Sequence, residues 1–331
     1  MTESRACGAT ILFRKLTSDD NLNAAWQRVR DNHGSAGVDG LSIEKFESSL
    51  NMNLAQLATE LSQGSYRPLP LLKITVAKKN GEGRGLSIPT VRDRVAQAAA
   101  LNVLEPILEP EFENCSFAYR KGRSWRQAVY QVKQYYEQGY CWVLDADIDA
   151  FFDSVPHKRL LDKVKRFISD KDIQKLISLW VRAEVWEGEA VNTLAKGIPQ
   201  GSVISPLLAN LYLDELDEEL LAQGIRLVRY ADDFLILCKT REKAEAATRL
   251  TEAVLKQMEL QLDEADIIHF DQGFRFLGVI FCRSTIMLPF DKEKEPKRVL
   301  YVPPPLNLKA YREGLLTAAG HRLQNQSISR L

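Results

Sequence analysis

The chain has 331 residues, which is enough for one large domain or two ordinary ones with a sizeable core. Its composition is 45% hydrophobic and 27% charged with no biased tract, which is typical of a soluble globular protein. Because 44 basic residues balance 44 acidic residues, the net charge is zero, and any binding of nucleic acid requires a local concentration of positive charge.

Several classes of protein are excluded by what the sequence lacks. No apolar run approaches the roughly 18 residues that a membrane span requires. The N-terminus has neither the basic start nor the long apolar stretch of a signal peptide, so we expect a cytoplasmic protein with no membrane partner. The five cysteines form no C-x-x-C pair and the four histidines stand alone. A disulfide scaffold and a structural zinc site are therefore not expected.

Positive charge is concentrated in two stretches of the chain. Residues 73–94 hold six basic residues against two acidic ones, and residues 119–133 hold five basic residues and no acid. The second stretch is interleaved with Tyr119, Trp125 and Tyr130. A charge run is often only a solvated face, and neither stretch establishes a binding surface by itself.

The first half of the chain is predicted to be helical on either side of one strand region. Apolar spacing predicts helices over 17–64, and the change to period two around a glycine-rich turn predicts strands within 66–90. Further helices are predicted over 91–109 and 123–138.

The second half of the chain mixes short strands with helices. In chain order we predict a strand at 141–148, helices over 157–187, a loop at 197–206, a helix that Ser205 caps and Gly224 ends, a hairpin at 226–238, a helix at 241–260 and a strand pair at 274–281. This mixture predicts an α+β fold in which helices surround a small antiparallel sheet.

Carboxylates occur at two of these strand positions. Asp145, Asp147 and Asp149 alternate along one strand and so share a face, while Asp232 and Asp233 stand at the tip of a hairpin with apolar arms. Taken alone, the Asp232–Asp233 pair fits an ordinary turn, and the alternating aspartates fit a solvent-exposed strand face. If the sets converged at about 5 Å, each pair would repel by roughly 3 kcal/mol at an effective dielectric near 20. Such a cluster persists only if protonated or metal-bound, and oxygen ligands without His or Cys favour Mg²⁺.

Four segments resemble the palm motifs of reverse transcriptases, and in particular those of the bacterial group II intron lineage. They are YADD at 230–233, DIDAFFDSV at 147–155, GIPQGSVISPLLANLYLDELD at 197–217 and FRFLGVIF at 274–281. Upstream segments agree with this resemblance: GVDG at 37–40, GSYRP at 64–68, RGLSIPTVRDRVAQ at 84–97 and FAYRKGRSWRQAV at 117–129. The likeness runs from about residue 20 to 285 in the expected order.

The resemblance implies an RNA-directed DNA polymerase with a right-hand fold of fingers and palm. It implies an N-terminal extension and fingers at 1–139, a palm with an antiparallel sheet and packed helices at 140–290, and a short C-terminal segment at 291–331, either a partial thumb or a linker. Such an enzyme extends a DNA or RNA primer along an RNA template by two-metal phosphoryl transfer from dNTPs.

The resemblance also implies roles for individual residues. Asp147, Asp232 and Asp233 would be catalytic and, with the carbonyl of Ile148, would hold two Mg²⁺ ions, for which Mn²⁺ can substitute. The residues expected to bind the dNTP are Lys78, Arg84, Phe152 and Gln200. Phe152 would close the space of a ribose 2′-hydroxyl, which favours deoxynucleotides.

Two further groups of residues would hold nucleic acid. Phe276, Leu277 and Gly278 correspond to the primer grip of the family. Arg120, Arg123 and Arg126 are expected to bind the template or another part of the nucleic acid.

Three departures from the family pattern affect the biological role. Ala265 and Asp266 stand where the family usually carries a lysine, and Gly85 and Ser87 replace residues of its Arg-Pro-Leu-Gly-Ile-Pro motif. Only 41 residues follow residue 290, which predicts a short thumb and favours a stand-alone relative. The sequence GFRFLGVIF at 273–281 resembles the CRISPR-associated branch of the family. This resemblance implies a CRISPR adaptation integrase or other phage-defence proteins as partners.

Four alternatives stay open at this point. They are a fragment of a group II intron mobility enzyme, a polymerase that works without a template, a non-catalytic palm that binds nucleic acid, and an RNA polymerase of the same architecture. Phe152 disfavours the last of these, because RNA polymerases of this architecture tend to place an Asp there. The three aspartates disfavour the third, since clustered charge brings no benefit to a mere binding module.

Overall fold

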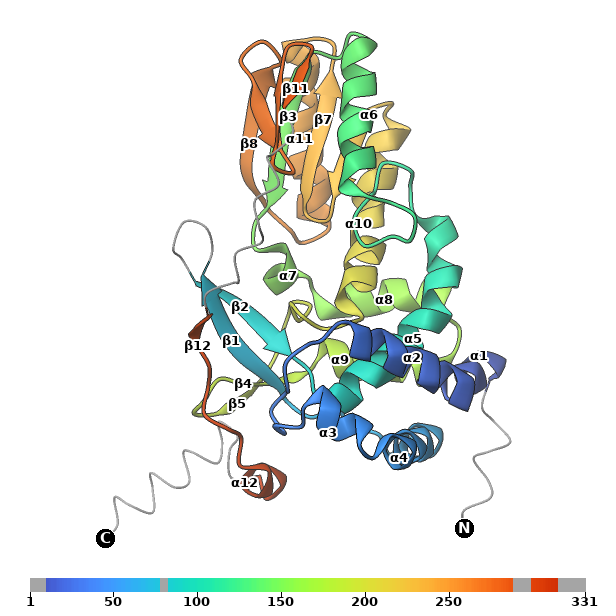
Figure 1. Ribbon diagram of the computed structural model, residues 1–331. Helices are drawn as coiled ribbons and strands as arrows, with labels where there is room; N and C mark the ends of the chain where they lie inside the picture. The colour runs from blue at the N-terminus through green and yellow to red at the C-terminus, as the bar shows by residue number, and fades with distance from the viewer. Residues whose placement is uncertain (1–9, 78–82, 288–298, 315–331) are drawn as a thin grey trace. The chain divides into compact units, whose positions relative to one another are not determined.

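The computed structural model describes residues 10–77, 83–287 and 299–314 (Figure 1). The chain divides into two compact units. Unit 1 comprises Met1–Ile107, His157–Ser205 and Lys297–Leu331, and unit 2 comprises Leu108–Pro156 and Pro206–Pro296. The units are thus discontinuous in sequence, whereas the predicted fingers and palm are contiguous stretches. Residues 157–205, which we expected in the palm, form part of unit 1.

Unit 1 is mainly helical. Its helices are α1 (Ile11–Leu16), α2 (Asp19–Asp31), α3 (Ile43–Glu47), α4 (Leu50–Ser62), α5 (Val91–Leu108, all but its last residue), α8 (His157–Phe167), α9 (Lys171–Val181) and α12 (Leu308–Arg312). Helix α2 begins after Ser18, whose hydroxyl accepts a hydrogen bond from the Asn21 amide and so satisfies one free donor of the first turn. Its buried face, which includes Trp26, packs against α4 and stacks on Phe46.

The sheet of unit 1 is built around its first strand. Its strands are β1 (Leu71–Ala77), β2 (Gly83–Ile88), β4 (Glu184–Trp186), β5 (Val191–Thr193) and β12 (Val299–Tyr301). β1 and β2 form an antiparallel hairpin, and β4 pairs with β1 in parallel. The predicted continuation of helix to residue 187 was therefore wrong, because Val185 and Trp186 are strand-forming residues that pair with Leu71 and Leu72.

Within the described residues, unit 2 contains two antiparallel sheets, four α-helices and a short 3-10 helix at Glu109–Glu111. Its elements are α6 (Trp125–Glu137), β3 (Trp142–Ile148), α7 (Phe151–Ser154), α10 (Ser205–Ala222, from its second residue on), β6 (Arg226–Tyr230), β7 (Asp233–Cys238), α11 (Arg241–Gln257), β8 (Leu262–His269), β9 (Phe274–Phe276), β10 (Val279–Cys282) and β11 (Thr285–Met287). The four-stranded sheet has the order β6-β7-β3-β8, and β9 to β11 form the other sheet. Helix α11 packs against β3, β7 and β8, while α6 packs against β6 and β7 (Figure 1).

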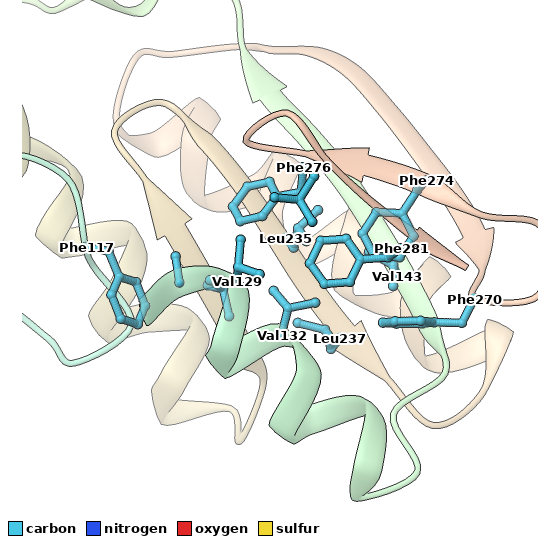
Figure 2. Packing of buried hydrophobic residues seen from close by; sticks show 13 residues of the cluster. Phe117, Val129, Val132, Val143, Leu235, Leu237, Phe270, Phe274, Phe276 and Phe281 are labelled. Atoms are coloured by element: carbon cyan, nitrogen blue, oxygen red, sulfur yellow. The ribbon is translucent and has the colours of Figure 1, made fainter. Parts of the chain in front are cut away.

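Alternating side chains of the four-stranded sheet define its two faces. Val143 of β3 and Leu235 and Leu237 of β7 point into one aromatic core (Figure 2). The opposite side of this core comes from α6 and from the β9–β10 hairpin, including Phe276 and Phe281. Hence the hairpin at 274–281 packs on the same sheet face that Val143 occupies.

These elements confirm the predicted α+β fold class, with helices around an antiparallel sheet. Helices and strands expected over 91–109, 123–138, 226–238 and 241–260 are present with boundaries that differ by at most three residues. In the part of the chain that the structure describes, no helix combines the length and apolar character needed to cross a bilayer.

Candidate active site

The tip of the β6–β7 hairpin carries the Asp232–Asp233 pair. Tyr230 pairs with Asp233, so only Ala231 and Asp232 form the turn. Ala231 has a φ of +64°, a left-handed conformation that costs a residue with a Cβ roughly 1–2 kcal/mol. Strain of this kind persists only where the surrounding structure determines the conformation, and it often accompanies function.

The third predicted catalytic residue, Asp147, lies on the neighbouring strand β3. The β3–β7 register pairs Ala146 with Phe234, so one further step places Asp147 opposite Asp233. Asp145 and Asp147 follow Val143 at intervals of two and therefore share its sheet face. An Asp147 carboxylate oxygen accepts the Ile148 amide at 2.9 Å.

Mutual repulsion and burial perturb these carboxylates strongly. Burial raises the pKa of Asp233 to about 7, and the nearby charges of three other aspartates, Asp145, Asp147 and Asp232, add to the shift. Burial likewise raises the pKa of Asp145 to about 6, with further contributions from Asp266 and Asp147. Asp266 stands directly opposite Asp145 in the β3–β8 register. Residues far apart in sequence thus form one interacting cluster of acids.

The donor chemistry of this cluster fits a hard divalent cation. Its carboxylates supply only oxygen ligands, as Mg²⁺ prefers, and the raised pKa values reflect burial first and mutual repulsion second, both of which a bound cation would offset. Ile148, whose carbonyl was predicted as a further ligand, lies in β3 with a buried side chain. Within the described ranges, no three His, Cys, Asp or Glu side chains are arranged as a metal-holding group. The structure therefore supports the ligand type but gives no coordination geometry.

Phe152 lies four residues after the end of β3 in the short helix α7. Its side chain is 7% exposed and packs edge-to-face on Phe151, with ring centroids 5.3 Å apart. Ala150 enters this helix with a φ of +40°, so the chain turns sharply after the strand. A fixed aromatic ring is compatible with the predicted sugar selection, which stays a prediction.

The predicted primer grip is the turn of the β9–β10 hairpin. Leu277 and Gly278 have φ values of +51° and +82°, as a type I′ turn requires at both central positions. Phe276 is fully buried in the aromatic core and anchors the hairpin to the sheet (Figure 2). Of the three predicted primer-grip residues, only Leu277 and Gly278 are accessible to a ligand, since Gly278 is exposed and Leu277 is half-buried.

Two predicted nucleotide ligands of unit 1 lie in contact. Arg84 Nε of β2 donates a hydrogen bond to Gln200 Oε1 at 2.8 Å, although 116 positions separate them. The Gln200 carbonyl accepts the Ser87 amide at 2.6 Å. Gly201 follows with a φ of +110°, and a Cβ there would lie 2.7 Å from the Ser87 carbonyl oxygen. Lys78 lies outside the described residues.

The three arginines predicted to hold nucleic acid differ in environment. Arg120 is 7% exposed, and its guanidinium bonds to Glu109 and to the carbonyls of Glu113 and Ser116. These bonds hold Arg120 within its own loop, and its contact with nucleic acid stays a prediction. Arg123 is half-buried and bonds to Asn114.

Arg126 is the exposed member of this group. Its guanidinium stacks over Trp125, 5.1 Å from the ring centroid. Tyr130, one turn later on α6, is 59% exposed. A basic group beside an exposed aromatic ring can contact both phosphates and bases, and the role of Arg126 in binding nucleic acid stays a prediction.

One functional candidate escaped the sequence analysis. Asp217 lies in an acidic run at 214–219, a pattern that is usual on a solvated face, yet it is fully buried and pairs with the buried Arg229. The available signal was Arg229, a charged residue that follows Leu227 and Val228 directly before the YADD tip. Sequence alone did not identify its partner.

Comparison with known families identifies the family of this chain. The family described as Reverse transcriptase (RNA-dependent DNA polymerase) matches residues 76–281, more than half of the chain. The chain belongs to the reverse transcriptase family. This reverse transcriptase is 32% identical over 310 residues to Protein YkfC of Escherichia coli K12, with 81% of each chain covered.

A second relative establishes the lineage. The reverse transcriptase is 30% identical over 276 residues to the Group II intron-encoded protein LtrA of Lactococcus lactis. The alignment covers 83% of this chain and 45% of LtrA, so the chain spans less than half of that relative. These matches confirm the expected membership of a group II intron-like lineage.

Solved structures bear on the fold. A telomerase from Candida albicans, in complex with a fragment of telomeric RNA, has a TM-score of 0.54 at 11% identity and covers 68% of this chain and 47% of its own. At that identity the likeness concerns the fold alone, and it confirms the predicted right-hand polymerase fold. A partial Cas6-RT-Cas1–Cas2 complex is also similar, at 27% identity over 75% of this chain and 42% of its own, with a TM-score of 0.46.

Proposed function

We propose that the protein extends a primer along an RNA template with deoxynucleotides, and that Asp147, Asp232 and Asp233 are its catalytic residues. The observation that carries this proposal is the carboxylate cluster of unit 2, in which burial and mutual repulsion raise the pKa of Asp233 to about 7. Membership of the reverse transcriptase family supplies the reaction class.

The proposal assigns Mg²⁺ to Asp147, Asp232, Asp233 and the carbonyl of Ile148. These residues would hold the ions, and the chemistry that Mg²⁺ would supply there is activation of the primer hydroxyl and neutralisation of charge on the leaving pyrophosphate. The protein itself contributes position and charge, because phosphoryl transfer requires no nucleophilic side chain. A rigid two-residue turn and a buried strand serve that need.

The proposal gives nucleotide and primer binding to other elements. In unit 1 it assigns Arg84 and Gln200 to the triphosphate, and their mutual hydrogen bond pre-orients both side chains. In unit 2 it assigns Phe152 to sugar selection and the Leu277–Gly278 turn to the primer end. The β9–β10 hairpin packs on the sheet face that bears Asp145 and Asp147, which supports the last assignment.

Primer extension tests this function. A labelled primer is annealed to RNA or DNA templates and incubated with Mg²⁺ and either dNTPs or NTPs. We expect extension with dNTPs on RNA, and none from the Asp232→Ala/Asp233→Ala variant. The matched control is Glu218→Ala/Glu219→Ala, which removes two adjacent exposed acids from the same unit and should extend normally. Folded, metal-loaded protein that extends no primer on any template would refute the proposal, and growth without a template would favour the template-independent alternative.

The cellular role is a finer proposal within this function. The sequence of residues 273–281 favours CRISPR spacer acquisition from RNA or another phage-defence process. Similarity to LtrA favours the alternative, a role in group II intron mobility. The partner expected for the first role is a CRISPR adaptation integrase. Its binding to the purified protein in a titration would support that role, and extension that depends on intron RNA would oppose it.

A further inference from the structure

Arg229 occupies an unusual place directly before the catalytic turn. It is fully buried, and its guanidinium donates two hydrogen bonds to the Asp217 carboxylate, at 2.8 and 2.5 Å. The remaining nitrogen donates to Asn210 Oδ1 and to the Ala231 carbonyl, both at 3.1 Å. One side chain therefore ties α10 to the residue that carries the strained φ of the turn.

The backbone of Arg229 adds a second set of ties. Its amide donates to the Cys115 carbonyl at 2.8 Å, and its carbonyl accepts the Phe117 amide at 3.0 Å. Asn210 in turn donates to the Ala118 carbonyl at 2.8 Å. The loop at 115–118, helix α10 and strand β6 thus converge on Arg229.

Stability alone does not account for such a group. Desolvation of a buried ion pair opposes its mutual attraction, and apolar residues of similar volume often stabilise a core as well or better. Burial by itself would lower the pKa of Arg229, but the charge of Asp217 and its hydrogen bonds outweigh this and raise it, so the guanidinium stays charged. What an apolar residue would lack is the directed bond to the Ala231 carbonyl.

We propose that Arg229, held by Asp217 and Asn210, is a positioning residue that fixes the Ala231 turn and thereby the placement of Asp232 and Asp233. The inference rests on the proposed polymerase function, and it concerns the residues behind the site rather than those that touch substrate. A carbonyl held at one end of a two-residue turn limits rotation of the peptide that leads into Asp232.

The decisive variant is Arg229→Lys, which keeps the positive charge but cannot make the forked bonds to Asp217 and the bond to Ala231 together. We expect kcat for single-nucleotide addition to fall about 100-fold, the size of effect that a misplaced reacting group produces. The KM for dNTP should change less than about threefold, because no nucleotide ligand is altered. The Mg²⁺ concentration for half-maximal rate should rise.

A second measurement does not depend on activity. Amide hydrogen exchange at residues 231–234 should be faster in Arg229→Lys than in the wild type, at equal global stability by urea denaturation. If Arg229→Lys does not fold, Asn210→Ala is the substitute variant, because it removes one hydrogen-bond acceptor of the Arg229 guanidinium. The control is Tyr212→Phe, which deletes a buried hydrogen bond from the same helix α10 to the Met258 carbonyl and leaves the turn untouched.

The outcomes separate the two proposals. Faster exchange at the turn together with a lower kcat, both absent from Tyr212→Phe, supports the positioning role. A folded Arg229→Lys protein with wild-type kcat and wild-type exchange overturns it, as does an equal loss in Tyr212→Phe. If the wild type extends no primer, the proposed function fails, but the exchange experiment still decides whether Arg229 holds the turn.

Discussion

Replacing Asp233 by Asn should stabilise the metal-free protein at high pH. The folded pKa of Asp233 is about 7, against an ordinary value of 3.8, because burial and neighbouring carboxylates disfavour its charged form. The folded state therefore binds more protons than the unfolded state between these pH values. The contribution of Asp233 to the free energy of unfolding is fully present below about pH 4 and is lost as the pH rises towards 7. This pH dependence is opposite in sign to that of a salt-bridged aspartate.

The magnitude follows from this difference in pKa. One pKa unit corresponds to about 1.4 kcal/mol, so a rise from 3.8 to about 7 sets an upper bound of about 4 kcal/mol. The side chain is partly exposed and the cluster titrates as a group, so we expect a gain of about 2 kcal/mol for Asp233→Asn at pH 8. At pH 4 the two proteins should be equally stable.

Urea denaturation with a chelator, followed by circular dichroism from pH 4 to pH 8, measures this difference. Asp162→Asn is the control, because Asp162 is an exposed acid on α8 whose pKa is lowered by a hydrogen bond from Lys165. It should leave the decline in stability with pH intact. Added Mg²⁺ should stabilise the wild type more than Asp233→Asn. Equal stability of wild type and Asp233→Asn at pH 8 would refute the claim that these acids repel one another in a shared site.

Three other substitutions test separate parts of the account. Phe152→Ala should raise ribonucleotide incorporation by about tenfold or more, and unchanged sugar selectivity in primer extension would remove its assigned role. Arg84→Ala should raise the KM for dNTP about tenfold, as expected for loss of a charged hydrogen bond, and an unchanged KM would contradict triphosphate binding. Gly201→Ala should destabilise the protein by about 2 kcal/mol or more, because the φ of residue 201 is nearly restricted to glycine and an alanine Cβ would meet Ser87. An unchanged temperature of thermal unfolding would contradict this.

The sequence predicted those parts of the fold that depend on local pattern. Period-two alternation identified β3, and apolar arms around YADD identified the β6–β7 hairpin, because strand burial leaves a direct record in residue type. The same reasoning failed at 184–186, where a three-residue strand is too short to carry a period and is fixed only by its partner β1.

Pairings between distant residues were beyond the sequence. The run at 214–219 has the composition of a solvated face, and only the fold shows that Asp217 meets Arg229 in the interior. Likewise, Asp266 was noticed as a missing lysine, whereas its position opposite Asp145 follows from the β3–β8 register. At Gly201 the structure reveals a reason for glycine that the sequence did not show, since a Cβ there would meet the Ser87 carbonyl.

The account depends most on the claim that the acid of β3 and the acids of the turn act as one site. Single-turnover nucleotide addition on an RNA template, measured for Asp147→Asn, Asp232→Asn and the double variant, tests it directly. We predict that each single change lowers the rate by about 10⁴-fold and that the double variant is no slower than the worse single one, because residues that act as a unit are not additive. Losses that multiply in the double variant, or a wild-type rate in either single one, would contradict the account.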